Sequence, residues 1–352
     1  MEFLQRKRCN NMILYIAEIG LNHNGELSLA KEMVDAAKES GTSAVKFQSI
    51  NAMKLIAKNA MDNKIDGFGF NNVNTVGEFW DKVGVDKAFH YEIKKYCDQK
   101  DIEFISTPFD FLSVDLLDEL GIRRFKVASG DLTHYPLLKK IARKSKPIIL
   151  STGMASIDEI DNVVLYCKDN DVKDLTLLHC LSLYPTRPEL ANLNAISFLK
   201  ERYRLPVGFS DHTIGSHISV SAIALGATII EKHFTIDNNL PGPDQKLSAN
   251  PEIFKRMVKE GNDVFKAIQQ KGKIVTLGEI KMKEFARRSI VAALDIQKGE
   301  ILMGNKLEYK RPGTGIGPNL VNQVIGRVVA VDIKMDAQIM ESDLKTQVFS
   351  KD

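Results

Sequence analysis

The fold is decided by a repeated pair of segments, first seen in ILYIAEIG at residues 13–20 and LSLAKEMVDAAKES at 27–40. The first segment is a short run with β-branched residues, which is typical of a buried strand. In the second segment apolar residues recur at helical spacing, so that one face of a helix would be apolar. That face carries Leu29, Met33, Ala36 and Ala37. The pair therefore predicts a strand followed by an amphipathic helix.

This strand and helix pattern recurs along residues 13–270. The further strand-like runs are SAVKFQSI (43–50), EFISTPF (103–109), RFKVASG (124–130), PIILSTG (147–153), LTLLHCLS (175–182), LPVGFSDH (205–212) and ATIIEKHFT (227–235). Eight parallel strands that alternate with helices over about 260 residues predict an α/β fold, a (β/α)8 TIM barrel. The alternative is a doubly wound open sheet, but no glycine-rich dinucleotide-binding turn follows the first strand.

The rest of the chain is organised around this predicted barrel domain at residues 12–270. Residues 1–11 precede the first strand and are expected to form a loose N-terminal extension. The stretch 51–85 is too long for an ordinary connection, and its Gly and Asn content argues against a further strand, so we expect a functional or mobile loop. A charged linker is predicted at 271–284, and a small β-rich domain is predicted at 285–352.

The composition excludes several classes of protein. Of the 352 residues, 44% are hydrophobic and 26% are charged, which excludes disordered and collagen-like chains. The 48 basic and 45 acidic residues give a net charge of only +3, so strong nucleic-acid binding is not expected. The apolar runs are too short to span a bilayer, no charged-then-apolar leader opens the sequence, and the cysteines form no CxxC pair. We therefore expect a soluble, cytoplasmic protein with no membrane partner.

Nearly every predicted strand ends in polar or ionisable side chains. They are Glu18, Lys46 with Gln48, Thr107, Lys126 with Ser129, Ser151, Ser182 with Tyr184, Ser210 with His212, and Glu231 with His233. Residues two positions apart point to the same face of a strand. In a parallel barrel the catalytic groups lie at the C-terminal ends of the strands. The pattern therefore predicts that these side chains converge on a polar, anion-binding site at the barrel mouth.

Two lysines on different strands, Lys46 and Lys126, have strand-end serines beside them. This arrangement suits a ligand that carries both a phosphate and a carboxylate. Two other interpretations stay open. The lysines could instead pair with Glu18 and Glu231 in a structural ion network. One of them could also form a Schiff base in an aldolase, so a strand lysine alone does not select the reaction.

Two histidines, His212 and His233, end adjacent predicted strands, where their imidazoles could share one cation. A lone strand histidine is more often a hydrogen-bonded core residue. Here Glu231 lies on the same face and Asp244 in the following loop, which favours metal binding. With two nitrogen ligands and the rest oxygen or water, Mn²⁺ or Mg²⁺ is favoured over a closed zinc site.

Ten motifs along the chain carry a resemblance to a known family. They are AEIGLNHNG (17–25), AVKFQ (44–48), STPFD (106–110), KVASGD (126–131), LSTGM (150–154), LLHCLSLYPT (177–186), GFSDHT (208–213), EKHFT (231–235), PGPDQKLS (241–248) and KRPGTGI (310–316). In this order they resemble the sialic acid synthase family, which includes N-acetylneuraminate, legionaminic and pseudaminic acid synthases. The resemblance covers about residues 13–348, and the C-terminal part resembles the antifreeze-like (SAF) module of these enzymes.

The resemblance implies a transferase that condenses phosphoenolpyruvate with a 2-acetamido sugar such as N-acetylmannosamine, giving a nine-carbon 2-keto acid and phosphate. It implies a divalent metal, with Mn²⁺ expected and Mg²⁺ or Co²⁺ as alternatives. It also implies a homodimer with swapped C-terminal domains. A synthase of the same family that acts on a 2,4-diacetamido-6-deoxy hexose is the nearest alternative. The more distant alternatives are a Schiff-base aldolase and a non-enzymatic carbohydrate- or ice-binding protein.

Individual roles follow from the same resemblance. Phosphoenolpyruvate is implied to be held by Lys46, Thr107, Lys126, Ser129, Ser151 and Ser210, the metal by His212 and His233, and the sugar by Glu18, Tyr184 and Asp244. Gln48 and Ser182 are expected to contact substrate as well. Arg311 is implied to reach the partner subunit's site and contact the N-acetyl group. Glu18, Lys46, Lys126 and Glu231 are expected to be catalytic, with Glu231 deprotonating or orienting the attacking water.

Overall fold

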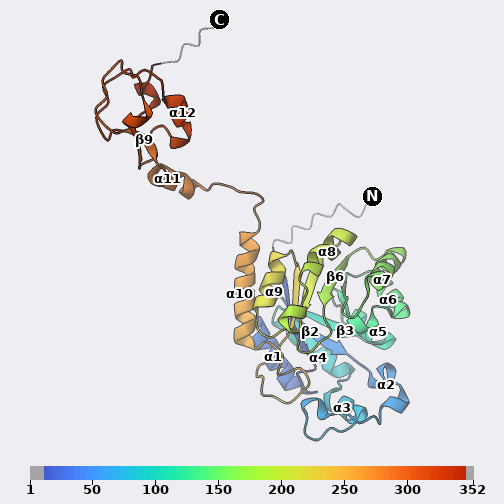
Figure 1. Cartoon of the computed structure of the whole chain (residues 1–352). Helices are drawn as coiled ribbons and strands as arrows, with labels where there is room; N and C mark the ends of the chain where they lie inside the picture. Colours follow the sequence, from blue (N-terminus) through green and yellow to red (C-terminus); the bar gives the residue numbers. More distant parts are fainter. Residues whose placement is uncertain (1–11, 346–352) are drawn as a thin grey trace. The chain divides into compact units, whose positions relative to one another are not determined.

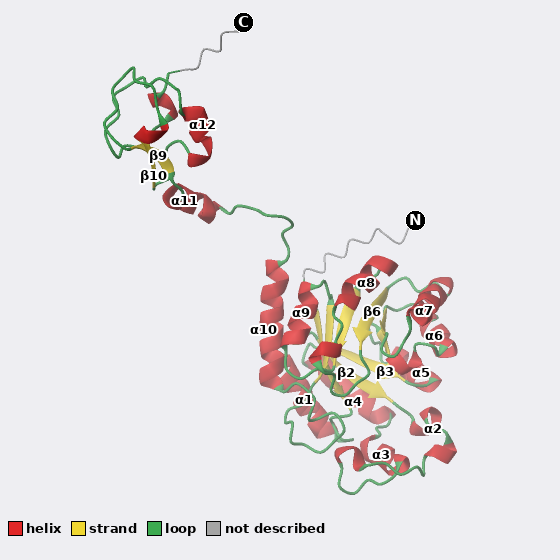
Figure 2. Ribbon diagram, viewed as in Figure 1, coloured by secondary structure: helices red, strands yellow, loops and turns green. Residues whose placement is uncertain are grey.

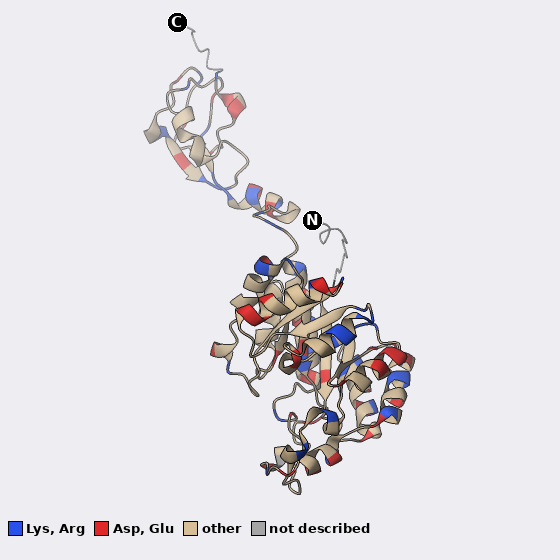
Figure 3. Ribbon diagram, turned by 90° about the vertical axis from the view of Figure 1, so that its right-hand side faces the viewer, with Lys and Arg blue, Asp and Glu red and all other residues tan. Residues whose placement is uncertain are grey.

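The chain divides into two units, Met1–Gln270 and Lys271–Asp352, of which a computed structural model describes residues 12–345. The extension expected at residues 1–11 lies outside the described residues. Each unit has a hydrophobic core of its own. No helix in the described part of the chain is long and apolar enough to cross a membrane. Around the first unit, Lys and Arg alternate with Asp and Glu on the outer helices (Figure 3).

Eight parallel strands form the sheet of the first unit. They are β1 Leu14–Gly20, β2 Ala44–Ser49, β3 Glu103–Pro108, β4 Phe125–Val127, β5 Ile148–Ser151, β6 Leu175–Cys180, β7 Val207–Asp211 and β8 Ile229–His233. Their order is β3-β2-β1-β8-β7-β6-β5-β4, and β3 and β4 contact each other, so the sheet curls into a nearly closed barrel (Figure 2). The predicted TIM-barrel fold is confirmed.

Helices surround the barrel and bury its outer face (Figure 1). They are α1 Leu27–Glu39, α4 Lys87–Gln99, α5 Phe111–Glu119, α6 Tyr135–Ala142, α7 Ile157–Asp169, α8 Asn194–Tyr203, α9 His217–Ala224 and α10 Pro251–Ala267. The fully buried positions of α1 are Ala30, Met33, Val34 and Ala37. Met33 and Ala37 lie on the buried face as predicted, whereas Ala30 and Val34 take the places expected for Leu29 and Ala36. Leu29 and Ala36 are partly buried at the edge of this face.

The interior of the barrel is built in two layers. The first is apolar and consists of Ile16, Ala44, Ile105, Ile149, Leu178 and Ile229. Burying such a side chain contributes about 1.5–3 kcal/mol, so this layer closes the barrel below the site. Because successive side chains alternate between faces, the residues two positions later also point inward. Those residues are Glu18, Lys46, Thr107, Ser151, Cys180 and Glu231. The floor of the barrel is therefore apolar and the layer above it is polar.

The long connection after β2 corrects one prediction. Instead of an irregular loop, residues 51–85 contain α2 Ala52–Leu55 and α3 Val76–Val83, and α3 starts with a capping box between Thr75 and Glu78. Leu21, Phe70, Val73, Phe79 and Val83 form a small separate core there. Gly69 packs directly on Gly242. A Cβ on residue 69 would lie 2.3 Å from the carbonyl oxygen of Gly242. This segment therefore supports the loop that carries Asp244.

The second unit begins with a helix where a linker was expected. α11 spans Leu277–Ala286 and is capped by Thr276, which accepts a hydrogen bond from the backbone N–H of Glu279. It overlaps most of the predicted linker, and none of its residues is buried. After it, β9 Ser289–Ala292 pairs antiparallel with β10 Leu307–Lys310, and the short helix α12 spans Val321–Val324. A small β domain at the C-terminus is thus confirmed.

Candidate active site

The polar layer of the barrel opens into a cavity of about 440 Å³. Its lining includes Glu18, Lys46, Gln48, Thr107, Lys126, Ser129, Ser151, Ser182, Tyr184, Ser210, His212, Glu231 and His233. These are all of the predicted site residues except Asp244 and Arg311. Every strand from β1 to β8 contributes to the lining directly or through the turn that follows it. The predicted convergence at the barrel mouth is what the structure shows.

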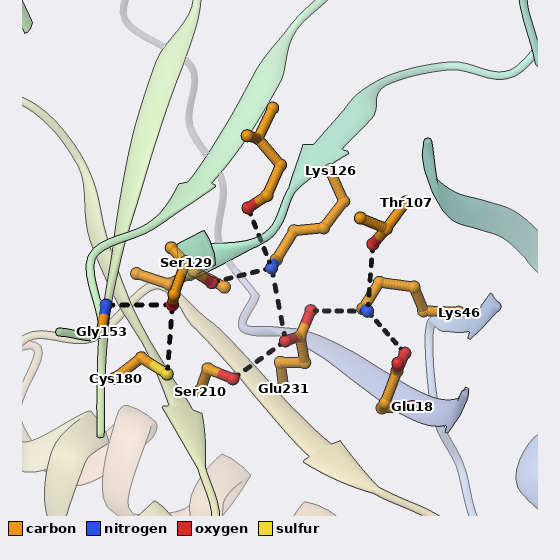
Figure 4. Close-up of polar contacts among 12 residues, drawn as sticks. Glu18, Lys46, Thr107, Lys126, Ser129, Gly153, Cys180, Ser210 and Glu231 are labelled. Carbon is orange, nitrogen blue, oxygen red and sulfur yellow. Dashed lines mark hydrogen bonds and ion pairs between the residues drawn. The ribbon is translucent and has the colours of Figure 1, made fainter. Parts of the chain in front are cut away.

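Two lysines and two glutamates form a buried ion network on one side of the cavity (Figure 4). The Nζ of Lys46 lies 2.6 Å from Oε2 of Glu18 and 3.8 Å from Oε2 of Glu231. The Nζ of Lys126 lies 3.6 Å from Oε1 of Glu231. The ion network that the sequence left open is therefore present, and it lines the cavity rather than the core.

Burial and these contacts shift the pKa values of the two lysines in opposite directions. Burial lowers the pKa of Lys46, but Glu18 and Glu231 outweigh it, and the net pKa is raised. Burial also lowers the pKa of Lys126, repulsion from Lys46 adds to it, and Glu231 compensates only in part, so this pKa stays lowered. Burial raises the pKa of Glu231, yet Lys126 and Lys46 bring it to about 2. Lys126 is thus the cation that an added anion would stabilise most.

Hydroxyl groups contact both lysines and Glu231. The Nζ of Lys126 donates a hydrogen bond to Oγ of Ser151 at 2.7 Å, and Ser210 donates from Oγ to Oε1 of Glu231 at 2.9 Å. Thr107 accepts from Nζ of Lys46 at 3.3 Å. Hydroxyls can reorient toward a ligand without leaving their positions. This side of the cavity therefore combines two cations with several donors, as an anion site requires.

One residue that supports the site, Gly153, was missed in the sequence, and so were five that line the cavity: Phe109, Ala128, Gly130, Met154 and Cys180. Cys180 is buried in the cavity wall, where burial raises the pKa of its thiol, and Ser129 donates a hydrogen bond to its Sγ at 3.7 Å. Gly153 donates from its backbone N–H to Oγ of Ser129 at 3.0 Å (Figure 4). Cys180 could have been found, since it follows the inward-facing Leu178 by two positions. The contact between Gly153 and Ser129 joins the turns that follow β5 and β4, and no sequence spacing predicts it.

Replacing Gly153 with Ala should weaken the anion side of the site. A Cβ there would lie 2.5 Å from Oγ of Ser182 and 2.8 Å from Oγ of Ser129, so both hydroxyls must move. Overpacking of this kind costs about 1–3 kcal/mol, which corresponds to about a 5- to 150-fold loss in kcat/KM for the anionic substrate. Gly278→Ala is the control, because a Cβ there meets nothing within 4 Å. Equal kinetics of the two variants would contradict this role.

The two predicted metal ligands face each other across the cavity mouth. Their ring centroids are 5.5 Å apart, and the ring of Tyr184 lies 4.2 Å from that of His212. Nδ1 of His212 lies 2.6 Å from the carbonyl oxygen of Leu181, so Nδ1 must donate and Nε2 keeps its lone pair. Burial, with repulsion from His233, lowers the pKa of His212 to about 4, which leaves this imidazole neutral at pH 7.

The histidine pair fits a divalent ion with an otherwise open coordination sphere. Nδ1 of His233 is buried and has no hydrogen-bond partner, and Oδ2 of Asp244 lies 3.7 Å from it. Among residues 12–345 no group of three or more His, Cys, Asp or Glu side chains is arranged to hold a metal ion. The sequence predicted that His212 and His233 would share one ion, with the remaining positions left to oxygen ligands or water, and their geometry is compatible with this prediction.

Arg311 belongs to the second unit, where it directly follows β10 and is exposed. It is the one predicted site residue outside the barrel unit, and it is not among the residues that line the cavity.

Comparisons with known proteins identify the family. Residues 33–273 match the NeuB family model, and residues 287–345 match the SAF domain model. The chain belongs to the NeuB family. An N,N'-diacetyllegionaminic acid synthase from Campylobacter jejuni is 42% identical over 93% of this chain and 99% of its own length. One from Legionella pneumophila is 38% identical over 92% of each chain.

A solved structure of a related synthetase agrees with this family assignment. The N-acetylneuraminic acid synthetase from Leptospira borgpetersenii, crystallised with citrate, is 35% identical, with a TM-score of 0.68 over 78% of this chain and 90% of that one. The NeuB family comprises phosphoenolpyruvate-dependent nonulosonic acid synthases, which generally use a divalent metal, and this chain is an enzyme of that class. The resemblance seen in the sequence, including its SAF module, is confirmed.

Proposed function

We propose that this chain condenses phosphoenolpyruvate with a 2,4-diacetamido-6-deoxy hexose, giving a legionaminic-type nine-carbon 2-keto acid and phosphate. The relatives named as legionaminic acid synthases are 42% and 38% identical to this chain, whereas the human N-acetylneuraminate-9-phosphate synthase is 32% identical over a similar share of it. This favours the diacetamido sugar over the N-acetylmannosamine expected first from the sequence. The observation that carries the proposal is the cavity in which two buried lysines, a histidine pair and serine hydroxyls meet.

The anion side of the cavity would hold phosphoenolpyruvate. Lys126 donates its hydrogen bonds to a hydroxyl and a carbonyl group, and its carboxylate partner Glu231 is 3.6 Å away, so a phosphate or carboxylate oxygen would supply a closer negative charge. Lys46, already paired with Glu18, would contribute a second positive charge from the neighbouring side. Ser129, Ser151 and Ser210 would complete the contacts with their hydroxyls. Binding here fixes the enol carbon relative to the sugar aldehyde, and such positioning supplies much of the rate.

The reaction then proceeds by addition and elimination. C3 of phosphoenolpyruvate attacks the aldehyde carbon of the open-chain sugar, and water adds to the positive charge that develops at C2. The tetrahedral intermediate releases phosphate by cleavage of the C2–O bond. Because Lys126 and Lys46 hold the pKa of Glu231 below its usual range, this carboxylate is a weak base, and we assign it to orienting the water and stabilising positive charge. Glu18 and Tyr184 would position the sugar.

His212 and His233 would hold the divalent ion, for which Mn²⁺ is our first choice and Mg²⁺ or Co²⁺ the alternatives. When bound, such an ion supplies Lewis-acid polarisation of a substrate carbonyl. Asp244, next to His233, would orient that imidazole or contact the sugar. We also propose a homodimer in which Arg311 of one subunit completes the site of the other.

An isotope experiment tests this course of reaction. Phosphoenolpyruvate labelled with ¹⁸O at the bridging oxygen should transfer its label to phosphate, because the C2–O bond breaks. Mass spectrometry of both products, with and without sugar, gives the measurement. Label retained in the keto acid would mean P–O cleavage and would contradict the proposal.

A further inference from the structure

A buried ion pair lies on the outer face of the barrel, directly behind the two histidines. Asp211 on β7 and Lys232 on β8 are register partners, and Nζ of Lys232 lies 2.9 Å from Oδ2 of Asp211. The two residues are 0% and 2% exposed. Since side chains alternate along a strand, His212 and His233 point into the cavity, while Asp211 and Lys232 point away from it.

The pair holds the backbone directly after His212. Oδ1 of Asp211 accepts the backbone N–H of Thr213 at 2.8 Å, and Nζ of Lys232 donates to the carbonyl oxygen of Thr213. Oδ2 of Asp211 also accepts a hydrogen bond from Oγ of Ser219 on α9. Both backbone groups of Thr213 are thus tied to charged side chains, one on each strand. His212 lies between the two residues that these bonds fix.

A pair this deep is a poor way to gain stability, because removing two charges from water costs about as much as their attraction returns. Apolar side chains would fill the same space between the strands and α9 without that cost. The charged side chains instead fix the geometry of the turn at His212, because each hydrogen bond ends on a defined atom of that turn. Lys232 is also chain neighbour to His233, so one side chain links the positions of both imidazoles.

We propose that Asp211 and Lys232 are positioning residues that set the distance and orientation of His212 and His233 for a shared divalent cation. This inference rests on the metal site of the proposed function. The pair lies on the far face of the strands and touches no substrate. The ion pair would hold the two histidines in position before the ion binds. Outer-shell partners orient metal ligands in the same way in other metal sites.

The test is Mn²⁺ binding to the full-length Lys232→Met variant without substrates, followed through the electron paramagnetic resonance signal of free Mn²⁺. Loss of an outer-shell partner should weaken Mn²⁺ binding about 10- to 100-fold. Affinity for phosphoenolpyruvate, measured without metal, should stay unchanged. Arg124→Met is the matched control, because it breaks a two-point ion pair with Glu103 at the opposite end of the barrel strands. This control should lower the melting temperature and leave Mn²⁺ affinity as in the wild type.

A milder variant covers the case in which Lys232→Met does not fold. Ser219→Ala removes one hydrogen bond to Asp211 but leaves the ion pair with Lys232, and it should weaken Mn²⁺ binding about two- to tenfold. Wild-type Mn²⁺ affinity in a folded Lys232→Met, or in Ser219→Ala if only that variant folds, would overturn the positioning role.

His233→Ala separates this failure from failure of the proposed metal site. If His233→Ala also keeps wild-type Mn²⁺ affinity, the metal site is wrong and the positioning role falls with it. If His233→Ala loses the ion while Lys232→Met keeps it, only the positioning role is wrong.

Discussion

Replacing His233 with Ala should abolish metal-dependent release of phosphate from phosphoenolpyruvate. The variant keeps one of the two imidazoles that we propose as metal ligands, and the stabilisation that a metal gives to developing charge is several kcal/mol. We expect a rate at least about a thousandfold below the wild type, which corresponds to about 4 kcal/mol. The fold should survive, because Nδ1 of His233 has no hydrogen-bond partner to lose. Phosphate release after dialysis against EDTA, with and without added Mn²⁺, is the measurement.

His217→Ala is the control for this variant, since His217 is exposed at the start of α9 and does not line the cavity. It should keep the wild-type rate and the wild-type response to Mn²⁺. A His233→Ala enzyme that still responds to Mn²⁺ like the wild type, or a wild type that keeps its full rate in excess EDTA, would remove the metal from the mechanism.

Arg311→Ala should lose sugar turnover while its barrel still binds phosphoenolpyruvate. Arg311 is exposed at the end of β10, within the region that matches the SAF domain, so its removal leaves the cavity of the barrel unit intact. Removing a charged partner from a desolvated site costs about 2–5 kcal/mol, or at least about a 30-fold loss in kcat/KM for the sugar. Lys310→Ala is the control for a general effect of losing charge at this turn.

Mixing two inactive proteins tests whether Arg311 acts on the partner subunit. In a heterodimer of Arg311→Ala and His212→Ala subunits, one of the two sites would contain both intact residues. Free exchange makes half of the dimers mixed, so about a quarter of the wild-type activity should return. Exchange shown by a labelled subunit, with no recovery of activity, would place Arg311 in its own subunit or outside the mechanism.

Much of the barrel and its site could be predicted because both depend on the alternation of side chains. The step from Ile16 to Glu18, or from Ile229 to Glu231, moves from the apolar floor to the polar layer on the same face. Such a step is visible in any strand that ends in a polar residue. The predicted pair of His212 and His233 follows from the same rule.

Other features depend on contacts between distant segments. The helices at residues 51–85 are held by Phe70 and Phe79 in a core that only the folded chain assembles. For α3 and α11 a local signal was nevertheless present, since each starts with Thr followed three residues later by Glu. Asp211 and Lys232 lie in the motifs GFSDHT and EKHFT, but their pairing and burial could not be predicted, because both depend on packing against α9.

The central claim is tested most directly by measuring which sugar drives release of phosphate from phosphoenolpyruvate. The panel contains N-acetylmannosamine, its 6-phosphate, and the 2,4-diacetamido-6-deoxy hexoses of the legionaminic and pseudaminic series, each with Mn²⁺. We expect the legionaminic-series sugar to give the highest kcat/KM, at least about tenfold above N-acetylmannosamine, because a site built for a second acetamido group leaves polar atoms unpaired without it. Highest turnover with N-acetylmannosamine would contradict the proposed sugar. No sugar-dependent phosphate release with any of the four would contradict the proposed reaction itself.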